Sequence, residues 1–454
     1  MAFAGRIRPL NPWLLGCLAV CVGIGVLAGI NPEYGLIGAL GVMLAVITIM
    51  DLTLGFVLFT IASFLDLTSS TGSFSGIKVV GLVLFVSWLA RIGTRRSTEL
   101  GSFAAENPML AMSLVAMLAW ATLSFAWAFS PSTALGGAGR YALNMMLLPI
   151  GFAAMRERRH VAWVLAAYVV GAALSAVYGF ATSSATGFSG RLTGSIGDPN
   201  AEATVLAASI PLLIGVVGMF RPSARTKLVA IVVGIILFAG LFSTVSREGL
   251  VALAAVMIGA VVFGGRWRGR AAALLAIGVC VTVGYFFVLA PLAARQRVTM
   301  ADTSGRSSIW TVAWRVVEAH PVLGVGNDNF ILVEGRYVNQ PGAVLATYII
   351  GNPRVVHNAY LEALADLGIP GLLTLLAVLA LSLGAGIRAA WMFERLGDRE
   401  MELVSRCVVL AIIAVLTAAL FVSSEYGKYL WLLLAVCPAL LALARRTTPQ
   451  VATS

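Results

Sequence analysis

Long apolar runs recur along almost the whole chain and restrict the folds that it can adopt. A helix needs about 17 to 25 mostly apolar residues to cross a bilayer. Candidate spans lie at 12–30, 34–50, 52–65, 76–93, 108–129, 138–155, 160–181, 202–219, 226–243, 248–264, 271–290, 367–388, 403–422 and 427–443. Hydrophobic residues make up 59% of the chain and charged residues 11%, which is too apolar for a soluble domain of this length. We therefore expect an all-α polytopic membrane protein with 12 to 14 transmembrane helices.

Basic residues alternate from loop to loop, as they do when Lys and Arg are retained on the cytoplasmic side. With a cytoplasmic N-terminus, twenty of the 31 Lys and Arg residues fall in predicted cytoplasmic segments, among them Arg158, Arg266 and Arg406. This orientation puts the long loop 291–366 outside the cytoplasm. The net charge of +11 then reflects topology and attraction to anionic membrane lipids, and it does not indicate a nucleic-acid partner.

The pattern predicts one membrane domain with one elaborated loop. We divide it into N-terminal transmembrane helices (1–290), the extracytoplasmic loop with short helices (291–366), C-terminal transmembrane helices (367–446) and a cytoplasmic tail (447–454). The first thirty residues begin like a signal peptide but lack a convincing cleavage site, so we favour a retained first span. The five cysteines lie inside predicted spans, and no HExxH, Cys–His cluster or DxD pair is present. The sequence therefore predicts no metal and no cofactor.

The long loop holds the densest set of chemically capable residues. It carries six arginines, six carboxylates and two of the three histidines. Within it, apolar residues at helical spacing predict an amphipathic helix over Ser307–Ala319, with Thr303 or Ser304 as N-cap. Arg306 falls at the start of this helix, where the dipole disfavours a cation unless an anion such as phosphate binds there too. The alternative is that Arg306 is solvated or pairs with Asp302.

His357 is the stronger candidate of the two loop histidines. It precedes Asn358, a predicted N-cap, so the positive helix end should lower its pKa and favour a neutral imidazole. A neutral imidazole can accept a proton from a sugar hydroxyl. The alternative is a polar residue at the membrane interface. His320 is interpreted as a helix C-cap, and the glycines that follow it in PVLGVGN as a structural turn.

Three further arginines lie at external ends of predicted spans. Arg247 follows a very short reversal and has Glu248 beside it, so the two residues are one possible pair. Arg140 is explained equally well as a snorkelling anchor. Arg191 lies in an external turn in which Asn200 is a predicted N-cap. Together, Arg191, Arg247 and Arg306 with His357 would provide several anion-binding groups and one base on a single side of the membrane.

Three motifs resemble the O-antigen ligase and O-antigen polymerase family of bacterial membrane glycosyltransferases. They are SREGLVAL (246–253), GRSSIW followed by HPVLGVGNDNF (305–330), and HNAYLEALADLGIPGLL (357–373). The resemblance implies a GT-C-like fold in the bacterial inner membrane and a metal-independent, inverting transfer. The donor it implies is an undecaprenyl-pyrophosphate-linked glycan, and the acceptor is a glycan, lipid or protein hydroxyl.

By the same resemblance, His357 would be the general base, and Arg306 and Arg247 would bind the pyrophosphate. We assign Arg191, Asn358 and Arg140 to substrate binding. Glu248 departs from the family pattern, in which this position is small, and we expect it to weaken pyrophosphate binding. The competing hypothesis is a transporter or flippase of lipid-linked glycans, but the middle of nearly every span is apolar. Ligase and polymerase activities are not separated by the sequence.

Overall fold

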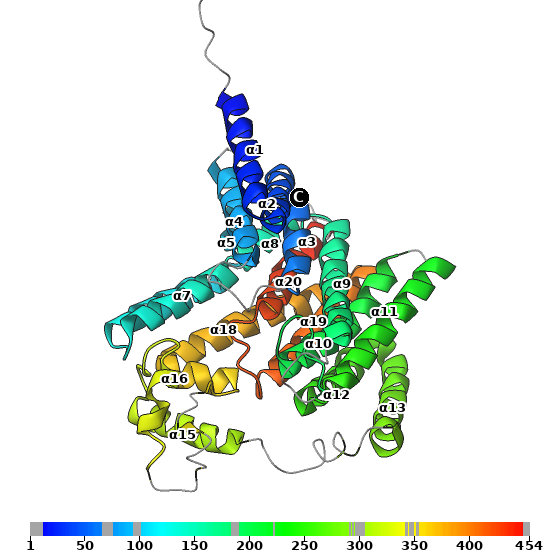
Figure 1. Cartoon of the computed structure of the whole chain (residues 1–454). Coiled ribbons are helices and arrows are strands. Elements are labelled where there is room, and N and C mark those ends of the chain that lie inside the picture. The colour runs from blue at the N-terminus through cyan, green and yellow to red at the C-terminus, as the bar shows by residue number, and fades with distance from the viewer. Residues whose placement is uncertain are drawn as a thin grey trace, which may run out of the picture.

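The computed structural model describes residues 12–65, 76–93, 101–182, 190–220, 223–289, 305–340 and 354–447, with 292, 295, 344, 349 and 350. Every regular element in these segments is a helix, and they contain no β-strand (Figure 1). The predicted all-α class is therefore confirmed.

Eight helical segments of the described chain are long and apolar enough to cross a membrane. They are α6 with the 3-10 turn that follows it (Pro108–Ala126), α9 (Arg158–Thr182), α10 (Pro199–Met219), α11 (Ala224–Ser243), α13 with its preceding turn (Gly265–Gly284), α18 (Ala359–Arg395), α19 (Arg399–Ala418) and α20 (Lys428–Thr447). This agrees with a polytopic membrane protein. The total of 12 to 14 spans and the GT-C-like arrangement stay predictions.

The other helices include apolar N-terminal segments and the short elements around the site. They are α1 (Pro12–Ile30), α2 (Pro32–Met50), α3 (Leu52–Ala62), α4 (Gly76–Gly93), α5 (Gly101–Glu106), α7 (Pro131–Met145), α8 (Leu147–Ala154), α12 (Arg247–Phe263), α15 (Arg306–Ala319) and α16 (Phe330–Val333). A π-turn at Tyr285–Leu289 follows α13, and a 3-10 turn at Glu334–Arg336 follows α16.

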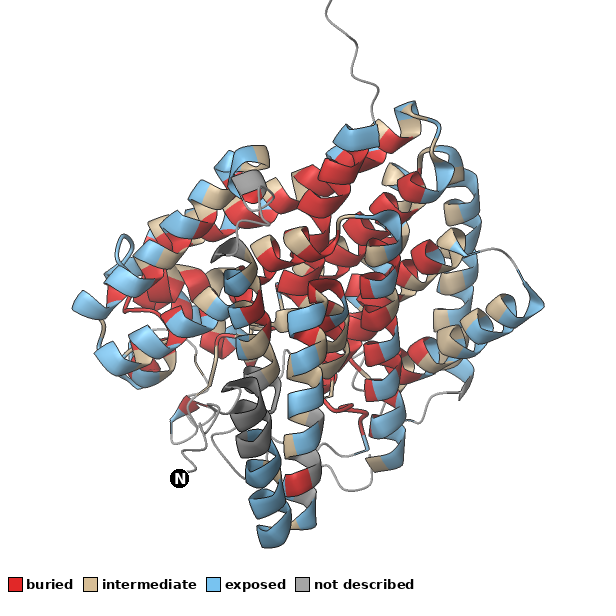
Figure 2. Ribbon diagram, turned by 90° about the horizontal axis from the view of Figure 1, so that it is seen from above, coloured by how far each residue is buried: buried red, intermediate tan, exposed pale blue. Residues whose placement is uncertain are grey.

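The centre of the bundle is formed by α19 and α20. In their most apolar windows, 78% of α19 and 83% of α20 is buried, against 22% for α11 and none for α13. Helices that are apolar but unburied suit contact with lipid. Figure 2 shows the buried residues in the middle of the molecule and the exposed ones on the outer helices. The site described below lies at one end of this central group.

The predicted span 138–155 is not one continuous helix. α7 ends at Met145 and α8 starts at Leu147. Pro149 accounts for the break, because proline has no N–H for the carbonyl four residues earlier, that of Met145. The sequence signal at this position was apolarity, which predicts burial or membrane contact but not continuity.

The loop between α13 and α18 folds around a small apolar core of its own. Ile309, Val312 and Val316 of α15 are fully buried against Phe330 and Val356. The predicted amphipathic helix is thus confirmed, and it begins at Arg306. Gly305, with φ 76°, occupies the N-cap position. The predicted caps Thr303 and Ser304 lie outside the described residues.

The glycine turn after α15 is matched to a break in α18. Gly368 has φ 65° and ψ −168°, which interrupts the helix. The freed carbonyls of Ala365 and Asp366 accept hydrogen bonds from the N–H groups of Val325 (3.0 Å) and Gly326 (2.9 Å). PVLGVGN is therefore a structural turn, as predicted, and it fixes the loop to the first turns of α18.

Candidate active site

The external turn that carries Arg191 is tied to the reversal between α11 and α12. Arg191 is buried, and its Nε donates to the Thr244 carbonyl while Nη2 donates to Asn200 Oδ1, both at 2.8 Å. The Leu192 N–H also donates to the Ser243 carbonyl at 2.9 Å. The predicted N-cap Asn200 is wrong, because Asp198 caps α10 and its carboxylate accepts from the Asn200 and Ala201 N–H groups. The turn alone did not explain Arg191, and these bonds do: the guanidinium joins two segments at the same end of the bundle.

The reversal itself has an unusual backbone. Val245 has φ 48°, which is a rare conformation for a β-branched residue. Ser246 then caps α12, and its Oγ lies 2.7 Å from Glu248 Oε2 and 3.1 Å from Asn200 Oδ1. Arg247 is the first residue of α12 and is half-buried. Gly249 allows close packing here, since a Cβ on it would lie 2.5 Å from Ala203 Cβ.

Arg306 meets this cluster from the other side. Its guanidinium forms an ion pair with the Glu248 carboxylate, and the two side chains are only 13% and 7% exposed. The alternative that Arg306 is solvated is therefore wrong, and the carboxylate beside it is Glu248. Arg306 is the cation at the N-terminus of α15 that the sequence left unexplained, and Glu248 of α12 neutralises it.

His357 faces the same charged group. Burial lowers the pKa of its imidazole, and the Arg306 and Arg354 guanidinium groups lower it further, while Asp198 and Glu248 oppose the shift. The direction agrees with the predicted neutral imidazole, although burial and Arg306 are the leading causes. The predicted N-cap is confirmed, because Asn358 Oδ1 accepts hydrogen bonds from the Tyr360 and Leu361 N–H groups at 3.1 and 3.0 Å.

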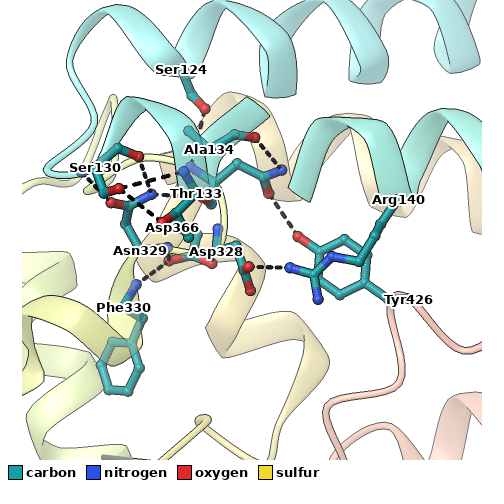
Figure 3. Close-up of polar contacts among 11 residues, drawn as sticks. Ser124, Ser130, Thr133, Ala134, Arg140, Asp328, Asn329, Phe330, Asp366 and Tyr426 are labelled. Carbon is teal, nitrogen blue, oxygen red and sulfur yellow. Dashed lines mark hydrogen bonds and ion pairs between the residues drawn. The ribbon is translucent and has the colours of Figure 1, made fainter. Parts of the chain in front are cut away.

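Arg140 lies in a second polar group (Figure 3). It forms an ion pair with Asp328, and its guanidinium lies 4.3 Å from the ring centroid of Tyr426. Tyr426 in turn donates to Asn327 Oδ1 at 2.9 Å. The structure thus places Arg140 with Asp328 and Tyr426, whereas Arg191 and Arg306 belong to the Glu248 group.

Asp366 organises this second group. Its carboxylate accepts hydrogen bonds from three consecutive backbone N–H groups, those of Asp328 (2.7 Å), Asn329 (3.2 Å) and Phe330 (2.7 Å). Burial raises the pKa of Asp328, and Arg140 opposes that shift. Sequence reasoning missed Asp366 because no local pattern links it to a turn 38 residues earlier.

An apolar cavity of about 700 Å³ lies among α10, α11, α12, α13 and α19. It runs from Phe242, at the end of α11 next to the reversal, to Trp267 before α13. Phe242 packs on Tyr285 with 4.9 Å between ring centroids. The described residues contain no group of three or more His, Cys, Asp or Glu side chains placed to hold a metal ion.

These features define a polytopic helical membrane protein with an arginine-rich site at one end of its bundle, near a half-buried imidazole. Residues 210–376 match the family model described as O-antigen ligase. The predicted family is confirmed, and with it a glycosyltransferase-type enzyme of a bacterial membrane. The match includes Arg247, Arg306 and His357. No curated protein matches the chain.

Proposed function

We propose that this protein is an inverting, metal-independent glycosyltransferase of the O-antigen ligase or polymerase type. It moves a glycan from undecaprenyl pyrophosphate to an acceptor hydroxyl on the extracytoplasmic face. The observation that carries the proposal is the linkage of three separate segments at Glu248. Arg306 pairs with its carboxylate, Arg191 is linked to it through Asn200 and Ser246, and the charges of Arg306 and Glu248 act on the His357 imidazole.

In the proposed reaction, the acceptor oxygen attacks the anomeric carbon of the donor. The bond from that carbon to the pyrophosphate oxygen breaks, and its electron pair leaves with the undecaprenyl pyrophosphate. The acceptor proton passes to the neutral imidazole of His357. Attack from the side opposite the leaving group inverts the anomeric configuration.

The arginines supply the charge that the leaving group needs. Arg191 and Arg306 are already oriented by protein acceptors, so little reorganisation accompanies their interaction with a diphosphate. Arg247 adds a further cation at the N-terminus of α12, where backbone N–H groups also favour an anion. Diphosphate oxygens would replace Glu248 as the partner of Arg306.

The apolar cavity supports a lipid-linked donor. Its lining is almost entirely apolar, and its Phe242 end adjoins the reversal that carries Ser246 and Arg247. A prenyl chain that enters between α11 and α13 would place its diphosphate at the arginine cluster. Binding then has only to orient a headgroup that the membrane already holds.

The test is transfer by purified full-length protein in membranes of a deletion strain, which hold donor and acceptor unreacted. Mass spectrometry of surface glycoconjugates identifies the missing linkage.

We expect His357→Ala and Arg306→Ala to lower the transfer rate by about 100-fold or more, with folding intact. Arg388→Ala, which changes an exposed arginine far along α18, is the matched control. Full transfer by both site variants would disprove the mechanism, and lipid translocation without a new glycosidic bond would favour a flippase.

A further inference from the structure

His357 is held in a backbone conformation that few residues adopt. Its φ is 56°, and the described residues contain only two other non-glycine positions with positive φ, Val245 and Asp328. All three flank the polar groups of the site. Such conformations persist only where the surrounding structure fixes them.

Four contacts hold residues 356–359 from different elements. The His357 N–H donates to Ser423 Oγ at 3.0 Å, and the Val356 carbonyl accepts from Trp310 Nε1 at 3.1 Å. The Ala359 N–H donates to the Ala419 carbonyl at 2.9 Å. A carboxylate, that of Glu362, completes the set. It accepts a hydrogen bond from the Ser423 hydroxyl and another from the backbone at Val356.

Ser423 differs from the other contacts because it bonds to residue 357 itself, and Glu362 acts on residue 357 through Ser423. Ser423 lies in the segment between α19 and α20, and Glu362 is buried in the first turn of α18. The Ser423 hydroxyl accepts a hydrogen bond from the His357 N–H and donates one to the Glu362 carboxylate. The carboxylate thereby fixes the orientation of the hydroxyl, and the hydroxyl fixes the backbone that carries the imidazole.

We propose that Ser423 and Glu362 are positioning residues for His357. They keep residue 357 in its left-handed conformation, so that the imidazole faces Arg306 and the bound donor. This inference rests on the proposed function of His357, and it adds two residues that do not touch the reacting atoms. Neither residue belongs to the arginine cluster, so donor binding should not depend on them.

The experiment compares full-length Ser423→Ala, Ser423→Thr and Glu362→Ala proteins. Ser424→Ala is the matched control, because this neighbouring buried hydroxyl forms no hydrogen bond with His357 or Glu362 in the described part of the chain. Three quantities are measured: the transfer rate in deletion-strain membranes, the affinity for undecaprenyl pyrophosphate, and amide hydrogen exchange of peptides covering 354–360.

We expect Ser423→Ala and Glu362→Ala to lower the transfer rate by about 10- to 100-fold, because small displacements of a catalytic group are costly. Affinity for undecaprenyl pyrophosphate should stay within about twofold, and the His357 amide should exchange faster. Ser423→Thr retains the hydroxyl and should restore most of the rate. The control should resemble the unmodified protein in all three measurements.

Two results would overturn the inference. One is Ser423→Ala protein with an unchanged rate and unchanged amide protection. The other is a loss of undecaprenyl pyrophosphate affinity as large as the loss of rate, which would indicate a general structural role. If His357→Ala retains full transfer, the proposed function fails instead, and amide exchange still decides whether Ser423 holds residue 357.

Discussion

At the scale of single residues, the site is defined by charges that already have protein partners. Arg306 is paired with Glu248, and Arg191 with Asn200 and the Thr244 carbonyl. A guanidinium held in this way is oriented for a diphosphate, but an acidic partner must first be displaced. Glu248 orders Arg306, and under the proposed function it would also compete with the donor.

The competition predicts tighter binding when the charge of Glu248 is removed. Glu248→Gln keeps the shape and a hydrogen-bond acceptor for Ser246, but it no longer attracts the guanidinium of Arg306 as an ion. We expect the affinity for undecaprenyl pyrophosphate to rise by about three- to tenfold, as measured by titration of purified protein. Glu394→Gln, which alters a carboxylate paired with Arg406 on other helices, is the control. Weaker binding by Glu248→Gln would show that ordering of Arg306 outweighs competition.

The lowered pKa of His357 predicts the pH range of transfer. Burial and Arg306 keep the pKa below its ordinary value of about 6.5, so the imidazole is neutral at pH 7. Activity should be lost only as the pH falls through this lowered value. Transfer rates between about pH 4.5 and 8 should therefore show an acid limb with its midpoint below 6.5. Glu248→Gln should move the midpoint lower still, because Glu248 raises this pKa. A midpoint above 6.5 would contradict the assignment of His357 as the base.

At the scale of elements, apolar runs and caps were predictable and long-range contacts were not. The bounds of α1 and of α4 match the predicted spans, and α18 begins after Asn358 as expected. The Glu248–Arg306 pair joins residues 58 apart, and the His357–Ser423 bond joins residues 66 apart. Local patterns report the periodicity of one segment at a time. They do not report which turns meet after the helices pack.

The break in α18 predicts a sharp effect of one substitution. In Gly368→Ala, a Cβ at φ 65° would overlap the Val322 carbonyl. We expect a loss of about 2 to 4 kcal/mol in the free energy of unfolding, because both the backbone conformation and the packing become strained. The thermal unfolding midpoint in detergent should fall accordingly. Gly384→Ala in the same helix is the control, since its Cβ would meet no atom within 4 Å. Equal midpoints for the two variants would show that the break is not needed.

At the scale of the whole molecule, α18 separates two polar ends of the protein. After its break, residues 369–395 extend about 40 Å, which exceeds the roughly 30 Å of a hydrocarbon core. The candidate site lies at the first end of this helix. Three ion pairs lie near the other end: Arg158 with Asp398, Arg266 with Glu402, and Arg406 with Glu394. All three arginines were predicted to be cytoplasmic, so their clustering agrees with the alternation of basic residues.

This arrangement predicts the membrane sides of two exposed glutamates. Glu318 lies on α15 beside the site, and Glu400 lies at the start of α19 at the opposite end. Each is replaced by cysteine in a variant whose five native cysteines are alanine. A membrane-impermeant maleimide should label Glu318→Cys in intact spheroplasts and Glu400→Cys only after lysis. The site would then face the compartment in which surface glycans are assembled, because helix α18 fixes the two ends on opposite sides. Labelling of Glu400→Cys in intact cells would reverse the topology and remove the extracytoplasmic reaction from consideration.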